Sequence, residues 1–151
     1  MRAADVAEYI LQRLGSMPTM KLQKLVYYCQ AWSLAWFGRP LFNERIEAWK
    51  KGPVVRSLWE LHRGEFIATS IPGHPDRLDG ASRRTIDAVL SFYGKKSADE
   101  LSDLTHVERP WRDARRGCSA DDRSACEIDQ DGMRSYYSKL GAAAGTVQPT
   151  V

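Results

Sequence analysis

Apolar residues recur along most of this chain at the three- and four-residue spacing of an α-helix. Segment 20–37 is apolar on almost every side of its helical axis, with Thr19 as a suitable N-terminal cap and Gly38 as a suitable end. The one interruption is a narrow stripe of Gln23, Tyr27, Gln30 and Ser33. Because a helix that is apolar nearly all round needs neighbours nearly all round, we expect residues 20–37 to form the most buried element, at the centre of a bundle.

Shorter amphipathic segments predict the helices that surround this central one. Asp5, with Glu8 three residues later, has the spacing of a capping box and predicts a first helix that ends at Gly15. Ser97 and Glu100 repeat that spacing before another helix. The other predicted helices carry apolar residues at helical spacing: Ile86, Val89, Leu90 and Tyr93; Leu101 and Leu104; and Met133, Tyr136, Tyr137 and Leu140. A further short helix is expected to start at Pro110 and to place Arg112, Arg115 and Arg116 close together.

Two short segments have the character of strands. Residues 46–50 alternate between two faces, and residues 126–128 could form a second strand that pairs with them antiparallel. Between them, Gly52 permits a sharp turn and Pro53 suits the first position of a helix. A single glycine between strand and helix is also found at phosphate sites, but a plain turn explains it equally well.

The remaining pattern sets the domain organisation. Residues 64–82 hold Pro, Gly and small polar residues without periodicity, which predicts an exposed loop and the best candidate for a mobile segment. We therefore predict a mainly α (α+β) fold, a single-domain helical bundle around the hydrophobic central helix with a short antiparallel β pair. The domain covers residues 1–140, and residues 141–151 form a flexible tail.

Charge and cysteine content narrow the function classes. Residues 1–64 hold 10 Lys and Arg against 5 Asp and Glu, a net +5, whereas the remainder holds 12 against 14, a net −2. This modest basic excess is typical of a solvated surface, so a nucleic-acid partner is disfavoured. The odd count of three cysteines, without a CxxC pair, suits free thiols in a reducing cytoplasm. No apolar run has the length of a membrane span.

The search for catalytic chemistry is mainly negative. The sequence lacks the GxSxG, HExxH and P-loop motifs. We therefore expect that the protein is not an enzyme and binds no cofactor. His106 and Glu108 flank Val107 and could act together on a proton, but a structural role for His106 at a helix junction is the favoured interpretation. With Cys118 these two lack the spacing of zinc ligands, so no metal site is expected.

Three separated motifs occur in order: KLQKLVYYCQAW, GRPLFNERIEAWKKGPV and LSDLTHVERPW. Together they resemble the Panacea domain family, which includes SocA-like and GepA-like phage-associated proteins. The resemblance runs from about Lys21 to Trp111. Lys51 departs from the family pattern, in which an aromatic residue is frequent at this position.

The resemblance implies an antitoxin that neutralises a cognate toxin by direct protein contact, without catalysis. Motif residues expected to hold the fold are Lys21, Leu22, Leu25, Ala48, Lys50, Gly52, Pro53, Val54, Thr105, Pro110 and Trp111. Residues expected to contact a partner, as polar or amphipathic side chains near exposed junctions, are Gln23, Lys24, Trp49, Lys51, Arg56 and His106. Trp49 could equally be buried core.

Three alternatives to direct neutralisation stay open at this point. An adaptor would deliver the toxin to a protease and would need a second contact surface, for which the tail GTVQPTV is a candidate. A DNA-binding role would need a recognition helix, and the sequence offers no convincing one. The third alternative is an enzymatic function, in which His106 and Glu108 would act as catalytic residues.

Overall fold

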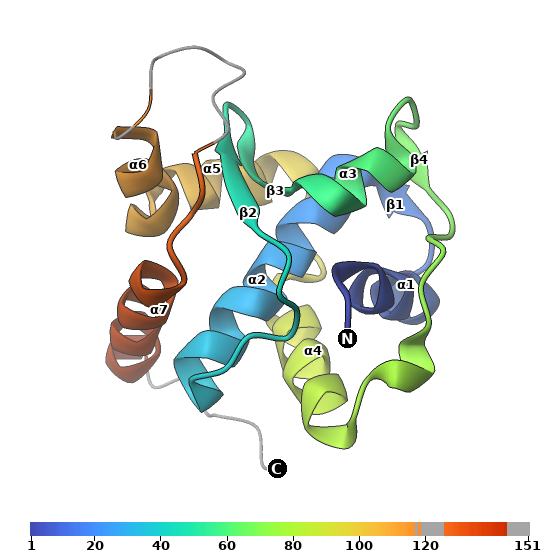
Figure 1. Ribbon diagram of the computed structural model, residues 1–151, viewed down its shortest axis with the longest axis horizontal. Helices are drawn as coiled ribbons and strands as arrows, with labels where there is room; N and C mark the ends of the chain where they lie inside the picture. Colours follow the sequence, from blue (N-terminus) through green and yellow to red (C-terminus); the bar gives the residue numbers. More distant parts are fainter. Residues whose placement is uncertain (117, 119–125, 145–151) are drawn as a thin grey trace.

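The computed structural model describes residues 1–116, 118 and 126–144 as a mainly helical domain with short antiparallel strand pairs, which confirms the predicted fold class (Figure 1). The elements, in chain order, are α1 (Ala3–Leu14), β1 (Met17–Pro18), α2 (Thr19–Phe37), β2 (Ile46–Trp49), β3 (Gly52–Val55), α3 (Arg56–His62), β4 (Ile67–Ala68), the 3₁₀ helix η1 (Pro75–Arg77), α4 (Gly80–Tyr93), α5 (Ala98–Val107), α6 (Arg109–Arg116) and α7 (Gln130–Ala144).

Helix α2 runs through the middle of the molecule, as the sequence predicts. In Figure 1 it crosses the domain between α1 on one side and α7 on the other. It contacts α1, α3, α4, α5 and α7 as well as the β3 strand. Every residue from Leu22 to Leu34 is buried, so the prediction that this is the central element is confirmed.

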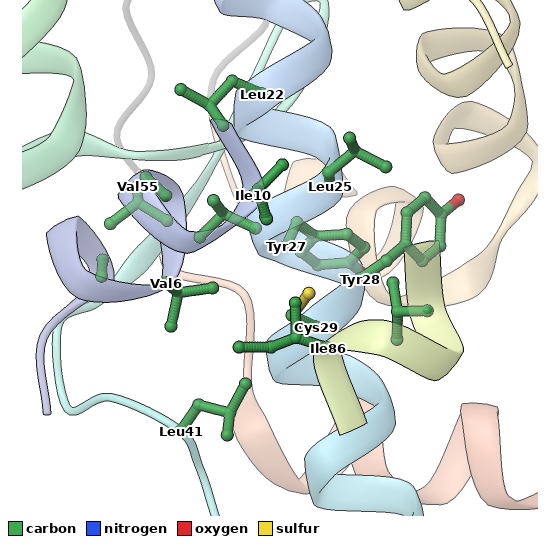
Figure 2. Close-up of a cluster of buried hydrophobic side chains, with 14 of the residues drawn as sticks. Val6, Ile10, Leu22, Leu25, Tyr27, Tyr28, Cys29, Leu41, Val55 and Ile86 are labelled. Atoms are coloured by element: carbon green, nitrogen blue, oxygen red, sulfur yellow. The ribbon is translucent and has the colours of Figure 1, made fainter. Parts of the chain in front are cut away.

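The hydrophobic core forms around this helix from both of its flanks. Figure 2 shows Val6 and Ile10 from α1 and Ile86 from α4 among the α2 side chains. Val55, from β3, completes this side of the cluster. Burial of such side chains is worth about 1.5–3 kcal/mol each, and this packing fixes where β3 can lie.

The polar stripe of α2 is buried too, and its side chains bind the backbones of neighbouring segments. Gln30 Oε1 accepts hydrogen bonds from Leu41 N and Phe42 N, and its Nε2 donates to Phe42 O. Ser33 Oγ donates to Arg39 O at 2.7 Å. Buried backbone groups outside regular structure need such partners, so the stripe holds the irregular segment that follows α2.

The β pair differs from the prediction in its main partner. β2 pairs with β3 in an antiparallel hairpin, with Ile46 opposite Val55 and Trp49 opposite Gly52. The expected contact with residues 126–128 is also present, as a single bridge between Glu47 and Glu127.

The helix expected to start at Pro53 begins later than predicted. The chain stays extended through Val55, and α3 starts at Arg56. The reason is tertiary: Gln23 Oε1 accepts from Val55 N at 2.8 Å and its Nε2 donates to Val55 O at 3.3 Å. A side chain that satisfies both groups of an extended residue favours strand over helix at this position.

The N-termini of α5 and α1 can be compared with the capping boxes predicted from sequence. Ser97 caps α5 with Glu100 in the predicted capping box. At α1 the box is displaced: the helix begins at Ala3, and Asp5 Oδ2 accepts from Arg2 N at 2.9 Å instead of serving as the N-cap. Asp5 is buried, and its other oxygen accepts from His74 N at 2.7 Å.

That bond belongs to residues 64–82, most of which are exposed as predicted. What the prediction lacked are the anchoring contacts: β4 pairs with β1, and the side chains of Ala68, Ile71 and Leu78 are buried. Glu8 Oε1 accepts from Ile71 N at 2.9 Å. The segment is thus anchored to α1 and to the start of α2.

The C-terminal region adds two differences. Cys118 and Cys126 form a disulfide, with Cα atoms 6.1 Å apart, where free thiols were expected; Cys29 is a buried free thiol. Helix α7 continues to Ala144, past the predicted boundary at residue 140. Most of the predicted tail, residues 145–151, lies outside the described residues.

Among the helices described, none combines the length and apolar character that a membrane span requires.

Candidate functional site

The corner between β2 and β3 is built around a glycine that packs against a buried lysine. Gly52 has φ +122°, a region that side chains rarely adopt. A Cβ atom there would lie 2.6 Å from Lys24 Cε and 3.0 Å from Thr105 Oγ1. The three residues come from three different motifs of the sequence, and the fold brings them into contact.

The α5 and α6 helices hold the backbone of this corner from behind. Ser102 Oγ donates to Lys51 O at 2.6 Å, and Trp111 Nε1 donates to Trp49 O at 2.7 Å. Arg115 Nη1 donates to Ala48 O at 3.1 Å. The third sequence motif therefore supports the second through side-chain to backbone hydrogen bonds, which fix the shape of the hairpin turn.

A pocket of about 360 Å³ opens beside the corner. The rings of Trp49 and Trp59 form part of its lining and meet edge to face, with centroids 5.4 Å apart. Both tryptophans are half-buried, so Trp49 is neither fully core nor fully exposed. The pocket is lined by Thr19, Met20, Gln23, Lys24, Trp49, Lys50, Lys51, Val54, Trp59, His62, Arg63, Gly64 and Glu65.

Positive charge dominates this lining. Lys50, Lys51 and Arg63 are exposed, and the guanidinium of Arg63 lies 5.4 Å from the Trp59 ring centroid in a cation–π contact. Glu65 is the one acidic residue of the lining. The combination of indole rings and cations suits an acidic ligand that also offers apolar surface.

Lys24 is the deepest charge in the pocket and is only 2% exposed. Its Nζ donates to Pro53 O at 3.1 Å, and no described carboxylate lies within salt-bridge distance of it. Burial lowers the pKa of Lys24 from its ordinary value to about 7, because an ammonium group is poorly solvated in the interior. Gln23 and Lys24, which were expected to contact a partner near an exposed junction, are both buried side chains that line the pocket.

Comparison with known proteins identifies the family. Residues 22–112 match the family described as "Antitoxin SocA-like, Panacea domain". The chain belongs to this family. Antitoxin SocA of Caulobacter vibrioides (strain NA1000 / CB15N) is 29% identical over 132 residues, which cover 72% of this chain and 68% of SocA. No solved structure shows significant similarity to the chain.

The Panacea span contains almost the whole pocket. Apart from Thr19 and Met20, all of the lining residues fall within residues 22–112. Helix α1 and helix α7 lie outside this span. The motifs that suggested the family from sequence supply six of its thirteen lining residues, namely Gln23, Lys24, Trp49, Lys50, Lys51 and Val54.

The other two predicted contact residues lie elsewhere. Arg56 lines a separate hollow, where its Nη1 lies 3.9 Å from Glu47 Oε1 and its Nε lies 3.7 Å from Glu60 Oε1. The ring of His106 packs against Trp111, with centroids 4.2 Å apart and the planes tilted by 35°. The structure therefore brings four of the six candidates to one pocket, namely Gln23, Lys24, Trp49 and Lys51.

The pocket also contains residues that the motifs did not single out. Trp59, His62 and Arg63 come from α3 and the residue after it. His62 is buried, and its Nε2 lies 3.0 Å from Gln23 Nε2. The helical spacing of Trp59 and His62, shared with Val55 and Leu58, was the available signal, and it predicts one face of a helix without indicating a pocket.

His106 and Glu108 do not form a hydrogen-bonded pair in the described chain. Glu108 is buried, and its Oε1 accepts from Tyr28 Oη at 2.6 Å and from Tyr137 Oη at 2.8 Å. Its neighbours are thus phenols of α2 and α7, whereas His106 packs on Trp111. The described residues also contain no group of three His, Cys, Asp or Glu side chains arranged to hold a metal ion.

We expect His106→Ala to lower the free energy of unfolding by about 2 kcal/mol, because it removes the packing against Trp111 and a hydrogen bond with the Lys50 backbone. Urea unfolding monitored by circular dichroism measures this loss. His74→Ala is the matched control, since His74 is exposed. A His106 variant as stable as the parent would contradict the structural role.

Proposed function

We propose that this Panacea protein neutralises a cognate toxin by direct binding, and that the corner pocket is its contact surface. The observation that carries the proposal is the pocket itself, with Trp49 and Trp59 in its lining and Lys51 and Arg63 among its cations. Family membership supports the antitoxin role, and the pocket supplies a surface on which such a protein could act without catalysis.

The composition of the pocket resembles that of binding hot spots. Tryptophan and arginine are enriched among residues that contribute most to protein–protein affinity, because they combine large apolar contact with hydrogen bonding. Here the two indoles are half-buried and therefore accessible. The hydrogen bonds from Ser102 and Trp111 preorganise the turn that carries Lys51, which reduces the entropy lost on binding.

Co-expression with a toxin encoded by a neighbouring gene tests the proposal. We expect Lys51→Glu to weaken the complex roughly tenfold or more and to restore toxicity, because it reverses a charge that faces an acidic partner. Arg56→Glu belongs in a separate strain, since it also breaks contacts with Glu47 and Glu60; as Arg56 lies outside the pocket, its effect should be smaller.

Lys139→Glu is the matched control, because Lys139 is exposed on α7 and does not line this pocket. Circular dichroism must show that each variant is folded. If folded Lys51→Glu protects the cell as well as the parent does, the corner is only a turn. The contact would then be sought first along Arg112, Arg115 and Arg116.

A further inference from the structure

The corner pocket holds a buried cation for which the described part of the chain supplies no carboxylate. Lys24 Nζ can donate three hydrogen bonds, and among the described residues its one acceptor is Pro53 O. Buried charges in proteins are ordinarily paired, because an unpaired one loses its hydration without compensation. The pocket lining places this ammonium group together with the indoles of Trp49 and Trp59.

Resting on the proposed function, we propose that the pocket receives an Asp or Glu side chain of the toxin, which pairs with Lys24, and an adjacent apolar side chain, which packs on Trp49 and Trp59. The charge of the lining selects for such an occupant: Lys51 and Arg63 are exposed near Lys24, against the single acid Glu65. A volume of about 360 Å³ is within the range of small ligand sites.

The geometry explains why the lysine is held ready for a partner. Gly52 leaves room for the Lys24 stem, because any Cβ at position 52 would meet Lys24 Cε. Pro53 O fixes the ammonium end at 3.1 Å. A carboxylate that enters the pocket would meet a cation whose position is already set, and the pair would form in a partly desolvated site where charge attraction is strong.

The neighbouring rings make the pocket suited to one acidic residue beside an apolar one. His62 lies in the same lining, and burial lowers its pKa, so that the neutral imidazole is favoured there. Lys24 is the buried group that can pair with a carboxylate: burial lowers its pKa to about 7, and an entering carboxylate would favour its protonated form. A single carboxylate would pair with Lys24, and the indoles of Trp49 and Trp59 offer apolar contact in the same lining.

The test measures affinity for the purified toxin and stability of the free antitoxin for the same variants. Lys24→Met keeps an unbranched apolar stem and removes the charge. We expect it to lower the toxin affinity about tenfold or more in calorimetric titration, while stability towards urea is unchanged or increased. Lys21→Met is the matched control, since Lys21 lies on the same helix but its Nζ donates to Gly94 O outside the pocket.

An Asp→Asn and Glu→Gln scan of the toxin then identifies the partner residue. One substitution should reproduce the loss caused by Lys24→Met and add nothing to it in the double variant. If Lys24→Met binds the toxin as tightly as the parent, the inference is wrong and the proposed function survives. Dependence on the toxin's terminal carboxylate instead of a side chain would also overturn it, and absence of binding by the parent protein would overturn the proposed function itself.

Discussion

Replacement of Gly52 by alanine should lower the free energy of unfolding by roughly 2–5 kcal/mol. Two effects add at this position. The backbone has φ +122°, which is strained for any residue with a Cβ, and the new methyl group would lie 2.6 Å from Lys24 Cε. Lys24 cannot easily retreat, because it is 2% exposed and its Nζ is bound to Pro53 O. Thermal and urea unfolding measure the loss.

Gly15→Ala separates the backbone strain from the steric conflict. Gly15 also has positive φ, +86°, but a Cβ there would meet nothing within 4 Å. We expect this control to cost about 1–2 kcal/mol from strain alone. In addition, Lys24→Ala should relieve part of the damage in a double variant with Gly52→Ala, because it removes the atom that the methyl group meets. Equal losses at Gly52 and Gly15 would show that the corner is not tightly packed.

The sequence predicted those parts of the fold that local patterns determine. The nearly all-round apolar character of residues 20–37 requires burial on every side, and α2 is indeed central. Gly38 ends this helix in the left-handed conformation, and the Ser97 capping box starts α5. In each case the signal and the structure lie within a few residues of one another.

The errors arose where distant residues decide the local conformation. Pro53 is a good first residue of a helix, yet the pairing of β3 with β2 and the bonds from Gln23 to Val55 keep the chain extended there. Residues 64–82 are mostly exposed, as their composition predicts, but the composition does not show that Glu8 and Asp5 bind their backbone. The spacing of apolar residues along the chain does not predict hydrogen bonds between such distant residues.

The candidate site was predictable only in part, for the same reason. The three motifs contribute Lys24, Gly52 and Thr105, which the fold places in contact. The burial of Gln23 and Lys24 follows from the predicted central place of this helix, but their bonds to Val55 and Pro53 could not be foreseen, since they depend on contacts between distant residues. Trp59, from α3, and Arg63, which follows that helix, also line the pocket, and neither belongs to a motif.

A second large effect is expected at Glu108, a buried carboxylate held by phenols. Besides Tyr28 and Tyr137, which donate to its Oε1, the network includes Tyr27, whose hydroxyl lies 3.0 Å from that of Tyr137. The ring of Tyr28 stacks on Tyr93 with centroids 4.1 Å apart. The network thus joins α2, α4 and α7 around one charge.

Glu108→Ala should cost roughly 2–4 kcal/mol, because it opens a cavity and leaves two buried hydroxyls without their acceptor. Glu108→Gln keeps an acceptor oxygen in place and should cost much less. Urea unfolding of the two variants at pH 7 compares them. Similar losses in both would mean that the charge matters more than the acceptor oxygen.

The pH dependence of stability gives an independent signature of the same carboxylate. Burial raises the pKa of Glu108 above its ordinary value of 4.5, although the bonds from Tyr28 and Tyr137 oppose the shift. The folded protein therefore keeps the Glu108 proton to a higher pH than the unfolded chain does. Stability should accordingly fall as the pH rises from 4.5 to the raised pKa, and should level off above it.

Glu108→Gln removes this contribution, so the parent's stability minus that of the variant isolates it from other titrating groups. His62 and His106 titrate with the opposite sign, since burial lowers their pKa values and stability falls as they become protonated. Urea unfolding of both proteins from pH 4.5 to 8 should give a difference that declines with pH. A difference that rises with pH would mean that the two phenols stabilise the ionised carboxylate more than burial destabilises it.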